Sequence, residues 1–235
     1  MTPLPPRRIL PACLIGLAVG LCNDVAFAQE RPPRAQPPDM QAIADALGVE
    51  CQFCHAPKAL TAAGRLRLDV AREMIAMTSE LNGRVARATG TDGTRVSCIT
   101  CHRGVTIPRQ LRDILFETLA RQGADAAIAQ YRDLRQRYHG GQAYDFGETT
   151  LLFVAERLVD SRPAAAIALA DLNLEFHPRS WRSHMTKGIA LSRRLETTPE
   201  ALESFRKALT IDPGNGVIEG WIVQTEPLAK RARPR

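Results

Sequence analysis

Residues 39–55 read DMQAIADALGVECQFCH, and this stretch decides how the first half of the chain is expected to fold. Asp39 is a favourable N-cap, and apolar residues then recur at helical spacing, at Met40, Ile43, Ala44 and Leu47. Gly48 is the kind of residue that commonly ends a helix. The stretch therefore predicts a helix over residues 40–47 that leads into a C-x-x-C-H motif.

The same arrangement recurs further along the chain. Residues 68–81 are predicted to form a second amphipathic helix, because one helical face would carry Val70, Met74, Met77 and Leu81. The helix is expected to end at Asn82-Gly83, and a short hairpin is expected between residues 84–88 and 94–96. A second C-x-x-C-H motif, CITCH, then follows. One pattern thus occurs twice: a helix that carries methionine, a turn or loop, and C-x-x-C-H.

The four cysteines after residue 28 all belong to these two motifs and are Cys51, Cys54, Cys98 and Cys101. C-x-x-C-H is the attachment signature of haem c. The two intervening residues let both sulfurs form thioether bonds to one porphyrin edge, which places the next residue, His55 or His102, under the iron as its proximal ligand. The sequence therefore predicts two covalently bound haem c groups.

Three other interpretations of the C-x-x-C pairs compete with haem attachment. A thioredoxin-like pair sits at a strand-to-helix junction of an α/β pattern, which this sequence lacks. A zinc site is the second, although 43 residues separate Cys54 from Cys98 and the common spacing is ~15–20. Two disulfides are the third, but such small loops stabilise little, and disulfides give no reason for a histidine after each pair.

The sixth iron ligand decides whether a haem only transfers electrons or also binds small ligands. After residue 28 the methionines are Met40, Met74, Met77 and Met185, and the first three lie on the helices that precede the motifs. The histidines outside the motifs lie far downstream, at His139, His177 and His184. These positions assign Met40 to the first haem and either Met74 or Met77 to the second.

The N-terminus has the features of a secretory signal peptide. Two arginines precede an apolar run from Ile9 to Cys22, and Ala26-Phe27-Ala28 supplies the small-x-small cleavage pattern before Gln29. The apolar run is short for a membrane anchor, which needs ~20 residues. We therefore predict a signal peptide over residues 1–28, export to the periplasm, and no membrane span in the mature chain. A proline-rich linker follows at residues 29–38.

The chain after Pro108 is rich in Ala, Leu, Arg and Glu and predicts successive helices. Three of its segments resemble the second helix and exit turn of a tetratricopeptide repeat, and they are residues 126–139, 165–178 and 201–215. Pro178 and Pro213 lie 35 residues apart, against a repeat period of ~34. We therefore predict a dihaem domain at residues 39–108, a repeat-like helical domain at 109–227, and a solvated basic tail at 228–235.

The two motif segments resemble the cytochrome c subunit of photosynthetic reaction centres. The resemblance covers residues 39–108 and includes both helices, their methionines and both attachment motifs. It implies that the first methionine of the Met74-x-x-Met77 pair is the ligand, so Met40 and Met74 would be the distal ligands. That subunit has two such two-haem units where this chain has one, so the chain is identified as a dihaem relative.

Electron transfer between redox protein partners is the function that these features favour, with docking through the haem domain or the helical region. No catalytic acid, base or nucleophile is evident. The net charge is +6, and the basic residues are scattered, which does not favour a nucleic-acid partner. Two alternatives stay open. One is a dihaem peroxidase in which one haem lacks its sixth ligand, and the other is a haem-containing interaction or sensor protein whose helical repeats bind a partner.

Overall fold

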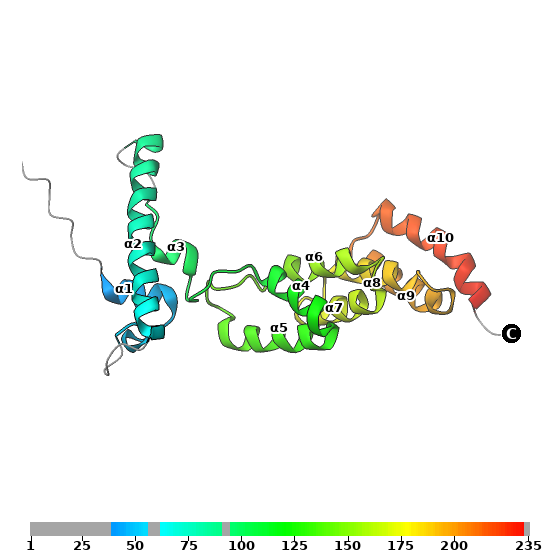
Figure 1. Cartoon of the computed structure of the whole chain (residues 1–235). Helices are drawn as coiled ribbons and strands as arrows, with labels where there is room; N and C mark the ends of the chain where they lie inside the picture. Colours follow the sequence, from blue (N-terminus) through cyan, green and yellow to red (C-terminus); the bar gives the residue numbers. More distant parts are fainter. Residues whose placement is uncertain (1–38, 56–61, 91–94, 233–235) are drawn as a thin grey trace, which may run out of the picture. The chain divides into compact units, whose positions relative to one another are not determined.

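The structure is a computed structural model of the chain, and it describes residues 39–55, 62–90 and 95–232. Within these ranges it contains ten α-helices, two short 3-10 helices and no strand (Figure 1). The mainly α fold predicted from the sequence is confirmed, whereas the few strands expected beside the motifs do not occur in the described residues. The predicted signal peptide and the proline-rich linker lie outside those residues.

Helix α1, Met40–Leu47, begins and ends where the sequence predicts. The carboxylate of Asp39 accepts hydrogen bonds from two backbone N–H groups of the first turn, at 3.0 and 3.1 Å. Gly48 adopts a left-handed conformation with φ of 65°, and its N–H closes the last turn of the helix. The first motif follows in the 3-10 helix η1, Cys51–Phe53.

Helix α2, Ala62–Thr89, is longer than predicted at both ends. It continues through Asn82-Gly83 because the side chain of Asn82 bonds outside the helix, to the backbone of Val96. The residues that follow, Arg84 to Ala88, are mostly good helix formers, and the chain leaves the helix only at Gly90, with φ of 86°. The hairpin predicted from residue 84 is therefore wrong: its first arm is the last turn and a half of α2.

Helix α3, Cys98–His102, carries the second motif and packs against α1. The N–H of Gly104 donates to the carbonyl of Ala46 at 2.8 Å. The two backbones approach so closely that a Cβ atom at Gly48 would lie 2.2 Å from the Gly104 carbonyl oxygen. Only glycine fits there, so the end of α1 is locked to the turn that follows the second motif.

Seven helices follow, as predicted for the chain after Pro108, and their bounds are α4 Leu111–Gln122, α5 Ala124–Tyr138, α6 Glu148–Leu158, α7 Pro163–Phe176, α8 Trp181–Leu191, α9 Thr198–Ile211 and α10 Gly216–Ala232. A 3-10 turn, η2 Leu195–Thr197, precedes α9. Consecutive helices from α6 to α10 pack on one another (Figure 1). Because their connections are short, neighbouring helices run antiparallel.

The helical region has a well-buried core of its own. Its largest fully buried side chains include Leu115, Tyr131, Leu151, Leu169 and Phe205. Helices α8 and α9 touch so closely that a Cβ at Gly188 would lie 2.6 Å from the ring of Phe205. The three repeat-like segments coincide with α5, α7 and α9, but the tetratricopeptide interpretation stays a prediction.

Helix α10 extends into the predicted basic tail as far as Ala232, so the first part of that tail is helical. Pro227 lies inside this helix. None of the helices in the described part of the chain is both long enough and apolar enough to span a bilayer.

Candidate functional site

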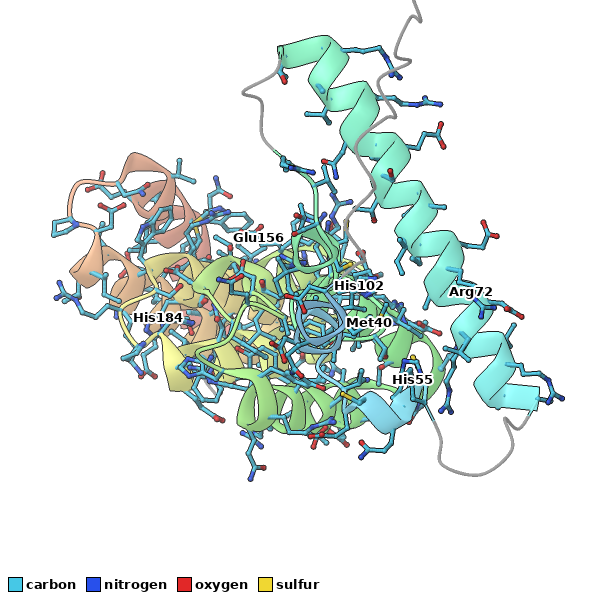
Figure 2. All side chains as sticks on the ribbon, turned by 90° about the vertical axis from the view of Figure 1, so that its left-hand side faces the viewer. Met40, His55, Arg72, His102, Glu156 and His184 are labelled. Atoms are coloured by element: carbon cyan, nitrogen blue, oxygen red, sulfur yellow. The ribbon has the colours of Figure 1, made fainter. Side chains whose placement is uncertain are left out.

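A first cavity, of about 260 Å³, lies between α1, the first motif and α2. Its lining brings together four residues that the sequence assigns to the first haem: Met40, Cys51, Cys54 and His55. The rest of the wall is mostly apolar and includes Ile43, Leu47, Val49, Leu68 and Ile75. Figure 2 shows His55 beside α2, the helix from which Arg72 projects. The distal and proximal candidates of the first motif therefore border one space.

A second cavity, of about 310 Å³, lies between α2 and the second motif. Met74, Cys98 and His102 all border it, together with the apolar side chains Leu66, Val70 and Ile107. Two predicted candidates, Cys101 and Met77, border neither of these two cavities. The geometry thus brings Met74, and not Met77, into the space that His102 borders.

The two cavities share a wall. Five residues line both of them, and these are Ile43, Leu47, Cys54, Ala71 and Ile75. Phe53, which belongs to the first motif, borders the second cavity. Both volumes lie near the lower end of the ~300–1,000 Å³ that is usual for ligand sites. Two groups bound here would be immediate neighbours, separated by a few apolar side chains.

Helix α2 serves both cavities because it presents two adjacent faces. Leu68, Arg72 and Ile75 follow one another at spacings of four and three residues and border the first cavity. Arg67, Val70 and Met74 follow at three and four and border the second. The periodicity of this helix therefore places one methionine and one arginine on the face of the second cavity.

A backbone hydrogen bond orients the second histidine. The Nδ1 atom of His102 lies 3.0 Å from the carbonyl oxygen of Val105, which can only accept, so the ring donates from Nδ1. In a neutral imidazole, a donor at Nδ1 leaves the lone pair of Nε2 for a metal. The chain turns back sharply to make the contact, with left-handed backbone at Arg103 and Gly104, φ 51° and 91°.

Asn82 holds the chain that leads into the second motif. Its side-chain amide donates to the carbonyl of Val96 at 2.8 Å, and its side-chain oxygen accepts from the Val96 N–H at 2.7 Å. Ser97 and Thr100 then cap the start of α3. The sequence pattern predicts only that Asn82 ends a helix. The only sequence signal for this role is an amide side chain that follows Met74 and Met77 on the same helix. The partner of this amide, Val96, lies 14 residues further along the chain, so the sequence pattern does not identify it.

The residues present fit haem c. Each cavity combines motif cysteine, histidine and methionine with a largely apolar wall, which suits a flat apolar ring bearing a metal. Large apolar side chains that line the cavities are unusually exposed. Met40 in the first cavity is 52% exposed, and Leu66 and Val70 in the second are 64% and 48% exposed. The four motif cysteines form no disulfide. No cluster of three or more His, Cys, Asp or Glu side chains that could hold a metal occurs in the described ranges.

Residues 38–136 match a family model described as the photosynthetic reaction centre cytochrome C subunit. The match covers both motifs and continues through α4 into α5. No curated protein and no solved structure gives a match to the chain. The family match supports a c-type cytochrome with covalently bound haem and redox partners, involved in electron transfer.

Proposed function

We propose that this chain is an exported cytochrome with two haem c groups that passes single electrons between redox proteins. Cys51 and Cys54 would hold the first haem, with His55 and Met40 as its axial ligands. The second would be held by Cys98, Cys101, His102 and Met74, and of these four Cys98, His102 and Met74 border the second cavity. The observation that carries the proposal is that each motif shares a cavity with one methionine from the helix that precedes it in the sequence.

Haem iron supplies one-electron chemistry, and a thioether ligand favours its ferrous state more than a second imidazole does. The protein contributes position and environment. Met40 and Met74 would occupy the ligand positions at which a substrate could otherwise bind the iron. The apolar walls limit the reorganisation of water when charge changes. The shared wall, formed by residues such as Cys54 and Ile75, gives electrons a short route between the two cavities.

Two further parts of the proposal rest on the sequence. The signal-peptide features of residues 1–28 support a periplasmic location, and haem c attachment outside the cytoplasm agrees with it. The repeat-like segments support a role for the helical region in docking a protein partner, because stacked helix pairs offer an extended binding surface.

A redox titration followed by visible and near-infrared spectroscopy tests the ligand set. The wild type should contain two low-spin haems, each with the far-red absorption band of methionine bound to ferric iron. Met40→Ala and Met74→Ala should each remove this band from one haem and leave the other unchanged. Met77→Ala is the matched control, because Met77 is on the same helix as Met74 but borders neither cavity, and it should keep both bands.

The same titration separates electron transfer from peroxidase chemistry. A wild-type haem that is high-spin and turns over peroxide would contradict the proposal, since it would show an open coordination position. Loss of a band in Met77→Ala, with no change in Met74→Ala, would overturn the assignment of the second distal ligand.

A further inference from the structure

Each cavity is lined by one arginine. Among the described residues that line the first cavity, Arg72 is the only Arg or Lys. Among those that line the second cavity, Arg67 is the only Arg or Lys. The other walls are largely apolar. A cation beside such a wall needs an anionic partner when the wall is covered, because an unpaired charge is costly to remove from water.

Arg67 is held in place by the first motif. Its guanidinium lies 4.4 Å from the centre of the Phe53 ring, and it donates to the Phe53 carbonyl at 3.1 Å. It forms no ion pair within the described part of the chain, so its full charge remains available at the second cavity. Stacking of this kind restricts the planar guanidinium to few orientations. Arg67 therefore joins the first attachment motif to the second site.

Arg72 has a different environment. It pairs with Asp69 at 2.9 Å, one turn back on the same helix. Glu50 also borders the first cavity. The Asp69 carboxylate thus offsets part of the charge of Arg72, whereas the contacts of Arg67 are a ring and a carbonyl. The electrostatic effect of a cation is expected to be larger in the second cavity than in the first.

We propose that Arg67 and Arg72 separately bind the propionate groups of the second and the first haem and raise their reduction potentials. This inference rests on the proposed function. Guanidinium and carboxylate pair strongly because two N–H groups match two oxygens. A positive charge held beside the haem disfavours the ferric state, which carries one positive charge more than the ferrous state. Each arginine therefore sets the potential of one haem, with the larger effect at Arg67.

Spectroelectrochemical titration of the full-length protein with both haems tests this proposal. Arg67→Gln should raise the ferric-to-ferrous ratio of the second haem about tenfold at a fixed applied potential, or about 59 mV for one electron, and leave the first haem unchanged. Arg72→Gln should shift only the first haem, and by less. The haems are told apart by the band that Met40→Ala or Met74→Ala removes.

Arg84→Gln is the matched control. It removes the same charge from the same helix, but Arg84 pairs with Glu80 at 2.7 Å and borders neither cavity, so both potentials should stay unchanged. Arg67→Lys keeps the charge and loses the planar fork, and should shift the second haem less than half as much as Arg67→Gln. An equal shift in Arg67→Lys would assign the effect to stacking on Phe53 and overturn the proposal.

Other outcomes also decide the question. Equal shifts of both haems in every variant, including Arg84→Gln, would reduce the effect to net charge and overturn the separate roles. Two attached haems whose potentials do not move in Arg67→Gln would overturn this proposal and leave the proposed function standing. A wild-type protein without attached haem would overturn both.

Discussion

The region of the two motifs and the helical region after it are stabilised in different ways. Among the described residues between 39 and 108, the buried apolar residues are small, at Ala44, Ala46 and Val105, and larger apolar side chains border the two cavities. The helical region contains all the largest fully buried side chains of the described residues, among them Tyr131 and Phe205. One region is organised around cavities and the other around its own core. The first should therefore depend on bound haem for stability, and the second should not.

The largest effect is expected from removing the covalent attachment. Replacing Cys51, Cys54, Cys98 and Cys101 by alanine should leave residues 39–108 without lasting hydrogen-exchange protection, because Ala44, Ala46 and Val105 form too small a core. Helices α4 to α9 should keep their protection. Hydrogen exchange measured by mass spectrometry on the wild type and the variant checks both regions together. Equal loss of protection in both would show that the two regions do not differ in this way.

The reverse experiment targets the helical core. Phe205 is fully buried, stacks on Trp221 with ring centres 5.5 Å apart, and touches Gly188. Phe205→Ala should lower the free energy of unfolding of the helical region by about 3–5 kcal/mol, measured by urea denaturation with tryptophan fluorescence. Haem absorption should not change. Val223→Ala is the control, since Val223 is 71% exposed and its loss should have little effect.

A single methyl group at Gly48 should disturb both haem sites. Its φ is 65°, and a Cβ there would lie 2.2 Å from the Gly104 carbonyl oxygen, so α1 must move away from the turn after α3. Gly48→Ala should cost about 2–4 kcal/mol in denaturation followed by haem absorption. Gly90→Ala shares the positive φ, at 86°, but a Cβ there meets nothing within 4 Å. Equal losses in the two variants would assign the whole effect to backbone strain and contradict the contact with Gly104.

The smallest expected effect is a loss of stability of the helical region at acidic pH. Burial lowers the pKa of His184 below its ordinary value of 6.5, and Lys207 and Lys187 lower the pKa further. The folded state then binds fewer protons than the unfolded state, so the helical region should lose stability as the pH falls below about 6.5. The urea midpoint should drop less between pH 7.5 and 5.5 in His184→Asn than in the wild type. An identical drop in both proteins would show that His184 makes no contribution.

Local signals in the sequence were enough for some elements of the fold. The bounds of α1 follow from the cap at Asp39 and the left-handed Gly48, which act within one turn of the helix. The end of α2 could not be predicted in this way. Asn82-Gly83 has the composition of a helix stop, but the partner of Asn82 is the backbone of Val96, and that contact exists only in the folded chain.

The candidate site shows the same division. The motif residues and the candidate methionines can be named from their spacing in the sequence. The amphipathic face of the helix does not distinguish Met74 from Met77 as the distal ligand of the second haem. Only the arrangement of the helices shows that Met74 and not Met77 borders the cavity of His102. Arg67 lies seven residues before Met74 and thus on the same helical face, so the helical period alone places this arginine beside the methionine.

The intact mass of the exported protein, measured under denaturing conditions, tests the central claim most directly. The account predicts the mass of the processed polypeptide plus two covalently attached haem groups. Cys98→Ala combined with Cys101→Ala should remove one of them and keep the haem at the first motif. A wild-type mass equal to that of the polypeptide alone would contradict the account, because neither motif would then carry a covalently attached haem.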